Sequence, residues 1–386
     1  MMTPNVFDSM RPFEPEELPA AYDELLADPA FRQVVGFAFP GLPFEALATK
    51  MKQCKTCLEF QICFCKPFLE GIVAKFSDGL SSDLSAVSPT SDKQNYTYIS
   101  NHRDIVLDSG FLDLTLVNNG LSTVEIAIGD NLLIYPWIRT LVRLNRSFIV
   151  SRSGGIHDML NNSRLLSGYI HYAVGEKQSS IWIAQREGRS KDSMDETQDS
   201  LLKMLTIAGE GSPKDKLRAI NLTPLAISYE YDPCDYLKAK EFQQKRDIEN
   251  FHKSPADDLI NMKTGIFGRK GRIHYQAAPC INGFLDTLPD DMPKQAFFSA
   301  VAKHIDHSIY ANYRLYSCNY IALDLLNGND MQSRYYQPSE KAAFEDYLRA
   351  QLVKIQLENK DEAYLRHKML EMYANPARHQ LALKEA

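Results

Sequence analysis

Short apolar runs alternate with helical stretches between residues 96 and 231, and this alternation constrains the fold more than any other feature of the chain. The runs are YTYIS (96–100), TVEIAIG (123–129), RSFIVSR (146–152), SIWIAQ (180–185) and AINLTPLAISYEY (219–231). Parallel strands need long crossover connections, usually helices, whereas antiparallel strands can be joined by tight turns. The order therefore predicts an α/β fold with a mostly parallel central sheet and flanking helices.

The segments outside this alternation divide the chain into three expected regions. Residues 1–85 are predicted to form a helical N-terminal region with a linker, because the Ser- and Asp-rich stretch from 77 to 95 has no periodicity and strong turn chemistry,. Residues 86–285 are predicted to form the α/β domain, with one more strand in GRIHYQAAPCI (271–281). Residues 286–386 are expected to be a helical C-terminal extension with many charged stretches,.

The charge and hydropathy of the chain narrow its partners and its location. A net charge of −6 and an isoelectric point near 5.9 argue against nucleic acid as the main partner,. The acidic, proline-broken N-terminus lacks the basic and apolar regions of a secretory signal,. No uncharged apolar run approaches the roughly 18 to 20 residues that cross a bilayer. We therefore expect a cytoplasmic protein whose contact with the membrane is peripheral.

Four of the seven cysteines cluster as Cys54, Cys57, Cys63 and Cys65. The two pairs are separated by five residues, whereas the ligand pairs of zinc ribbons are separated by about a dozen or more. The stretch also carries Leu58, Phe60, Ile62 and Phe64 at positions typical of a core. We therefore expect buried, reduced thiols and no metal site.

The stretch YISNHRDIVLDSGF (98–111) contains a His-Arg-Asp triplet that two chemistries could use. A protein kinase also requires a glycine-rich phosphate loop, a strand lysine, an Asn five residues after the Asp, and a DFG motif. Here residue 109 is serine and no DFG occurs, so the kinase interpretation fails. The other interpretation makes His102 a general base at the end of a strand, with a carboxylate that fixes its tautomer. Asp108 is the preferred carboxylate and Asp104 is the alternative.

Cationic residues follow two of the predicted strands. Arg152 comes just after SFIV, and Arg189, Ser190 and Lys191 follow IWIAQ. Because the ends of parallel strands present ligands at one edge of a sheet, these residues predict a phosphate site. A separate set, Arg139, Arg143 and Arg146, shares one face of a predicted helix,. That face is either solvated or directed at an anionic lipid or an acyl-carrier phosphate.

Four segments in order resemble the motifs of the glycerolipid acyltransferases, most closely the glycerol-3-phosphate and 1-acylglycerol-3-phosphate branch. They are YISNHRDIVLD, IGDNLLIYPWIRTLVRLNRSFIVSR, QREGRS and INLTPLAISYEYD, and the resemblance covers roughly residues 95–285. It implies that His102 and Asp108 are catalytic. It also implies that Arg152 and the loop formed by Glu187, Gly188, Arg189, Ser190 and Lys191 bind the substrate phosphate.

Two departures from the family pattern mark a divergent member. Five residues separate His102 from Asp108, where the family has four, and the third motif lacks the residue between Gly188 and Arg189. The first departure bears on which carboxylate orients His102. The second bears on whether Glu187 occupies the place of the family glutamate.

The resemblance implies transfer of a fatty acyl group from a thioester to the hydroxyl of glycerol 3-phosphate or a lyso-phospholipid. The acyl donor would be acyl-CoA or an acyl-acyl-carrier protein, so acyl carrier protein is a possible partner beside the membrane surface, and no cofactor is expected. For a lyso-lipid, the N-terminal helices with Phe60, Phe64 and Phe68 offer an apolar entry. The alternatives are an O-acyltransferase for a mono-acylated amino-acid lipid and a non-catalytic lipid- or phosphate-binding scaffold. A serine hydrolase is not expected, because no Gly-x-Ser-x-Gly elbow occurs,.

Overall fold

A seven-stranded sheet forms the centre of the molecule in the computed structural model, which describes residues 4–39, 41–87, 94–151 and 156–385. The strand order is β1-β7-β6-β2-β5-β3-β4. In chain order the strands are β1 (Leu80–Asp83), β2 (Thr97–Ser100), β3 (Glu125–Gly129), β4 (Ser147–Val150), β5 (Ile181–Ala184), β6 (Leu222–Tyr229) and β7 (Ile273–Ala277). Six of these correspond to the apolar runs predicted from the sequence.

The strands from β6 to β4 in the sheet are all parallel, as predicted, and only the β6–β7 pair is antiparallel among the described strands. β2 lies in the middle, with Ile99 opposite Ile183 of β5 and Pro224 of β6. The carboxyl ends of β2, β3, β4 and β5 consequently meet at one edge of the sheet. In an open parallel sheet this edge is the usual place for a ligand.

Two apolar layers cover the sheet, and successive residues of one strand point into different layers. In β2, Ile99 packs into the layer with α8 (Ile156–Gly175), α9 (Asp199–Leu205), α10 (Pro213–Ala219), α13 (Asn282–Thr287) and α14 (Lys294–Ala311). Tyr98 packs into the opposite layer with α5 (Lys66–Phe76) and α6 (Leu107–Asn118). Side chains of a strand alternate between faces in this way, so both faces of β2 are buried.

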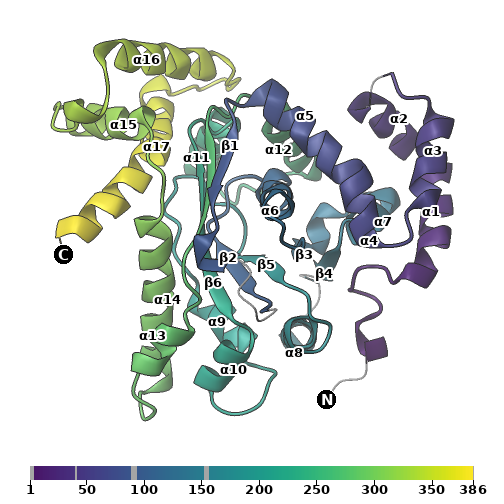
Figure 1. Cartoon of the computed structure of the whole chain (residues 1–386). Coiled ribbons are helices and arrows are strands. Elements are labelled where there is room, and N and C mark those ends of the chain that lie inside the picture. Colours follow the sequence, from purple (N-terminus) through teal and green to yellow (C-terminus); the bar gives the residue numbers. More distant parts are fainter. Residues whose placement is uncertain (1–3, 40, 88–93, 152–155, 386) are drawn as a thin grey trace.

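Two further helical groups lie at opposite sides of the sheet (Figure 1). The N-terminal group packs around its own core and contacts α7 (Pro136–Leu144). Its helices are α1 (Leu18–Ala27), α2 (Pro29–Ala38), α3 (Phe44–Gln53), α4 (Cys57–Phe60) and the π-helical turn η3 (Gln61–Cys65). The C-terminal group shares a core with α11 (Asp235–Asp247). Its helices are α15 (Ser317–Asn327), α16 (Pro338–Val353) and α17 (Glu362–Glu385).

The stretch predicted as a linker, 77–95, is structured over part of its length. It contains β1, which pairs in parallel with β7, and the 3-10 turn η4 (Ser85–Val87). The prediction of a linker was therefore wrong for residues 80–83, while residues 88–93 lie outside the described part of the chain. The division at 85 and 285 stays a prediction. None of the described helices has the length and apolar character needed to cross a bilayer.

Candidate active site

Asn101 fixes the chain at the point where β2 ends. Its side-chain amide nitrogen donates to the carbonyl of Ile227 at 2.9 Å, and its side-chain oxygen accepts from the Ile227 amide at 2.8 Å. Asn101 is completely buried, so this pair of bonds forms away from competing water. It holds the next residue, His102, at the carboxyl edge of the sheet.

The imidazole of His102 contacts the carboxylate of Asp108. His102 Nδ1 lies 2.8 Å from Asp108 Oδ2, which also accepts from the backbone amides of Arg103 at 2.6 Å and Asp104 at 3.0 Å. The hydroxyl of Tyr229 donates to Asp108 Oδ1 at 3.2 Å. A carboxylate surrounded by donors accepts the Nδ1 proton, which leaves His102 Nε2 with a lone pair for a substrate proton.

Asp104 has a different structural role. Its Oδ1 accepts from the amides of Val106 at 2.9 Å and Leu107 at 2.8 Å, which caps the start of α6,. Burial raises the pKa of this carboxyl, and the nearby Asp108 raises it further. The geometry therefore places Asp108, and not Asp104, in the orienting position, although the catalytic roles themselves stay predictions.

The ring of His102 is bounded by an aromatic neighbour. Trp182 meets it edge to face with ring centroids 5.5 Å apart, and the Trp182 indole nitrogen donates to Ser100 Oγ at 2.9 Å. Both side chains line one large cavity. Trp182 therefore packs against the ring of His102 at the wall of this cavity.

The cavity has a volume of about 1470 Å³, and its two ends differ in chemistry. The N-terminal helices and α5 contribute an apolar end, made of Phe31, Val35, Leu47, Met51, Phe60, Phe64 and Phe68. The other end is formed by the loop after β5 and by α12 (Pro255–Phe267) with the residues before it. This end carries the basic residues Arg186, Arg189, Lys191, Lys253 and Lys263.

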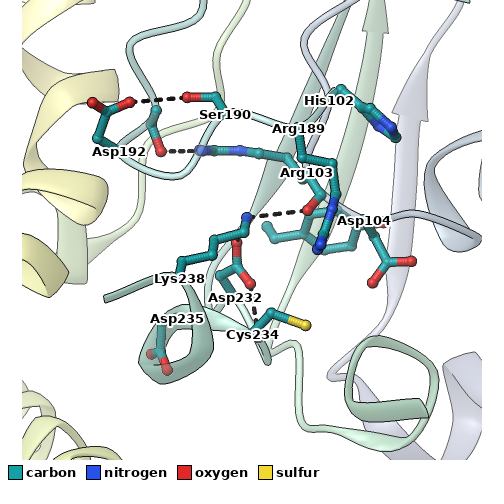
Figure 2. A network of polar contacts seen from close by, with 12 residues as sticks. His102, Arg103, Asp104, Arg189, Ser190, Asp192, Asp232, Cys234, Asp235 and Lys238 are labelled. Atoms are coloured by element: carbon teal, nitrogen blue, oxygen red, sulfur yellow. Dashed lines mark hydrogen bonds and ion pairs between the residues drawn. The ribbon is translucent and has the colours of Figure 1, made fainter. Parts of the chain in front are cut away.

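The residues predicted to bind phosphate fall into three groups. Glu187, Gly188, Arg189 and Lys191 line the cavity. Ser190 is completely buried, and its hydroxyl donates to Asp192 Oδ1 at 3.1 Å, so it supports the loop from behind (Figure 2). Arg152 lies outside the described residues. Gly188 has a φ of +68°, a backbone conformation that favours glycine at this turn,.

Arg189 and Lys191 differ in the protein groups that their charged ends already contact. Arg189 Nη2 donates to Asn261 Oδ1 at 3.2 Å, while its Nη1 is buried and has no hydrogen-bond partner among the described residues. Lys191 pairs with Glu241 at 2.9 Å, and Lys245 pairs with the same carboxylate. Burial lowers the pKa of Lys191, and Glu241 opposes that effect. Arg189 therefore lacks the acidic partner that Lys191 has among the described residues.

The arginines of the α7 region do not form a free basic face. Arg143 donates to the carbonyls of Arg11 at 2.8 Å and Asp8 at 3.0 Å, and Arg139 donates to the carbonyl of Ser9 at 3.2 Å. Arg146 lies beyond the end of α7 and bonds Thr123. Arg139 is exposed, as expected for a solvated face, whereas Arg143 and Arg146 are half-buried and attach the N-terminal segment and the β3 loop to the core.

Sequence reasoning missed several residues that shape the site. Asn101 and Tyr229 lie within quoted motifs, but their hydrogen bonds join positions 126 and 121 residues apart in the chain. Arg186 stands inside QREGRS without an assigned role. Lys253 and Lys263 belong to no motif, so only the tertiary placement of α12 and of the residues before it brings them to the cavity.

Comparison of the chain with protein-family models and with curated protein sequences gives no match. Among solved structures, the chain is similar to the crystal structure of the 1-acyl-sn-glycerophosphate (LPA) acyltransferase PlsC from Thermotoga maritima. The alignment has 11% sequence identity and a TM-score of 0.37, and it covers 74% of this chain and 92% of that chain. A likeness at this level does not establish a family, so the function has to be argued from the site itself.

Proposed function

We propose that this protein is an acyltransferase that moves a fatty acyl group from a thioester to the hydroxyl of a phosphate-bearing acceptor. One observation supports the proposal above the others. A single cavity brings a carboxylate-paired histidine, an apolar end and a cationic end together. Such a reaction requires a general base, a binding place for the acyl chain and a binding place for the acceptor phosphate in one site.

The chemistry follows from the orientation of His102. Its Nε2 takes the proton of the acceptor hydroxyl, and the acceptor oxygen attacks the thioester carbonyl carbon. The resulting tetrahedral oxyanion collapses, the carbon–sulfur bond breaks, and the departing thiolate takes the proton back from Nε2. Asp108 stabilises the imidazolium that exists between the two proton transfers,. Every atom and charge is accounted for by the two substrates and one histidine.

The cavity also supports an assignment of the substrate class. Its volume of about 1470 Å³ exceeds the ~300–1,000 Å³ typical of small-molecule sites, and its aromatic end suits a hydrocarbon chain. The cations suit a phosphate, because charge-assisted hydrogen bonds to an anion are the strong ones. The acceptor is therefore proposed to be glycerol 3-phosphate or a lyso-phospholipid, with acyl-CoA or an acyl-acyl-carrier protein as the donor.

Contact with a membrane surface belongs to the same proposal. Three apolar side chains that line the cavity are also exposed to solvent: Val34 at 45%, Tyr135 at 48% and Met159 at 58%. An apolar rim around such an opening suits transient contact with a bilayer, from which a lipid product or acceptor could exchange. We propose a peripheral association with the cytoplasmic face.

The test is an acyl-transfer assay with purified protein. Labelled acyl-CoA and acyl-acyl-carrier protein are each combined with glycerol 3-phosphate, a lysophosphatidic acid or a mono-acylated amino-acid lipid, and products are identified by mass. We expect product with a phosphate acceptor, loss of turnover in His102→Ala, and full turnover in His307→Ala, an exposed histidine of α14. Binding to vesicles with no product from any donor and acceptor pair would instead indicate a non-catalytic scaffold.

A further inference from the structure

The loop that carries His102 is tied to the loop after β5 by a buried arginine. The Arg103 side chain reaches away from His102 and into the protein, where its Nη1 donates to Ser193 Oγ (Figure 2). Arg103 is 9% exposed and Ser193 is completely buried. Ser193 also has a φ of +60°, which is strained for a residue with a side chain,. A strained, buried partner indicates that the surrounding structure specifies this contact closely.

A buried lysine holds the same residue from its other side. Lys238 Nζ donates to the backbone carbonyl of Arg103 at 3.1 Å and to Asp232 Oδ2 at 2.5 Å. Lys238 is 2% exposed. The attraction of Lys238 is the main influence that lowers the pKa of Asp232, against a burial effect that would raise it. The pair is therefore ionised, and it anchors the histidine loop to the start of α11.

Helix α17 contacts both Asp232, which pairs with Lys238, and the turn that precedes Ser193. The Asp232 amide donates to the hydroxyl of Tyr373 at 3.1 Å, and that hydroxyl donates to Asp235 at 2.8 Å. Two residues further along α17, Asn375 donates to the carbonyl of Asp192 at 2.7 Å. One helix therefore contacts Asp232, the ion-pair partner of Lys238, and the turn behind Arg189.

We propose that Arg103 and Lys238 are positioning residues that fix His102 relative to the 186–193 loop, and with it the distance from the base to the phosphate-binding cations. The inference rests on the proposed function. If Arg189 holds the acceptor phosphate while His102 removes the proton from its hydroxyl, the separation of the two loops sets where that hydroxyl lies. A misplacement of about 1 Å can cost about 100-fold in rate without weakening binding.

The sharpest variant is Ser193→Ala, which removes one hydrogen bond and leaves every charge in place. We expect kcat to fall by about tenfold or more while KM for the acceptor changes little, because Arg189 is untouched. Ser179→Ala is the matched control. Ser179 is also buried, and its hydroxyl accepts a hydrogen bond from Arg146 at 3.1 Å. It lies just before β5, whereas Ser193 lies in the loop that follows β5. This control should leave kcat unchanged. Arg103→Lys should reproduce the loss, and combining it with Ser193→Ala should add little, because both remove the same contact.

Amide hydrogen exchange supplies a readout that does not depend on turnover. Ser193→Ala should speed exchange in residues 102–108 and 187–195 together, and Ser179→Ala in neither. If the wild-type protein transfers no acyl group, the proposed function fails while coupled exchange still supports the tie between the loops. If the wild-type protein is active and Ser193→Ala alters neither kcat nor exchange, the positioning role is overturned. A general loss of stability with unchanged kcat also overturns it.

Discussion

The two ends of the cavity are held together by different forces. At the apolar end, rings of the N-terminal helices pack against one another: Phe60 stacks on Phe64 with centroids 5.3 Å apart, and Phe39 meets Phe64 edge to face at 6.3 Å. At the other end, directed hydrogen bonds fix His102, Asp108 and the loop after β5. Packing tolerates changes of shape, whereas a hydrogen-bonded constellation works in one geometry only. Under the proposed function, the polar end carries out the chemistry and the apolar end accommodates the substrate chain.

The largest effect is expected where the polar end orients the base. Asp108→Asn should lower kcat by about 10⁴-fold, as removal of an orienting carboxylate does elsewhere, because the amide favours the wrong tautomer of His102. Asp104→Asn keeps an oxygen that can cap α6 and should lower kcat far less. Steady-state measurement of kcat for both variants shows which carboxylate orients His102. If Asp104→Asn lowers kcat more than Asp108→Asn does, Asp108 is not the orienting carboxylate.

The apolar end should respond in stability and in substrate range. Phe64 is 6% exposed, and Phe64→Ala should lower the free energy of unfolding by about 3 kcal/mol, the low end for a phenylalanine because a cavity already borders it. Turnover of a short-chain donor should survive, while the preference among donor chain lengths shifts. Urea unfolding and a donor series measure the two effects.

Phe298→Ala provides the matched control for that experiment. Phe298 is completely buried in the layer formed by α8, α9 and α14, so its loss should destabilise the protein by a similar amount. The preference for donor chain length should stay the same. Identical shifts of preference in both variants would mean that general loosening, and not the cavity wall, sets the substrate range.

Within the polar end, two of the residues predicted to bind phosphate, Arg189 and Lys191, should differ. Arg189→Ala should raise KM for a phosphate acceptor by about 10-fold to 100-fold, the loss of one or two charge-assisted hydrogen bonds, with a smaller effect on KM for the donor. Lys191→Ala should raise it less, because Glu241 already pairs with that lysine. Equal changes in KM for donor and acceptor would mean that these cations bind the donor's phosphates.

The fold could be predicted from the sequence wherever burial leaves a local mark. β6 is buried at every position and has a mostly apolar sequence, LTPLAISY, as is typical of a strand enclosed on both faces. β1 could not be found in this way. Its sequence is LSSD, two of its four residues are exposed, and it lies at the edge of the sheet against a strand about 190 positions later. Nothing local in such a polar edge strand separates it from a turn.

The candidate site shows the same limit. His102 and Asp108 lie on one short connection, so their pairing could be proposed from spacing and strand position. The bonds from Arg103 to Ser193 and from Lys238 to Arg103 span 90 and 135 residues. Buried charges of this kind look like ordinary surface residues in a sequence, because only the tertiary fold shows that they are enclosed.

The smallest expected effect concerns a buried carboxyl that joins the N-terminal helices to the sheet. Asp113 of α6 accepts from the amide of Val124 at 2.8 Å and from Gln61 of η3 at 3.0 Å. Burial raises the pKa of Asp113 to about 7, well above the ~3.9 of an exposed aspartate. The attachment of the N-terminal helices to the sheet therefore includes a carboxyl that is protonated in the folded protein below neutral pH.

This pKa makes stability depend on pH in a definite direction. Between about pH 4 and about pH 7 the folded protein holds a proton on Asp113 that the unfolded chain has released, so stability falls as the pH rises through this window. Asp113→Asn should lack that part of the decline, while Asp23→Asn, which alters an exposed ion pair with Lys52, should decline as the wild type does. Burial also raises the pKa of Asp235 to about 7, so its contribution remains in all three proteins and cancels in the comparison. Thermal unfolding across the window measures the difference, and parallel curves for wild type and Asp113→Asn would mean that the carboxyl joining the N-terminal helices to the sheet is ionised throughout.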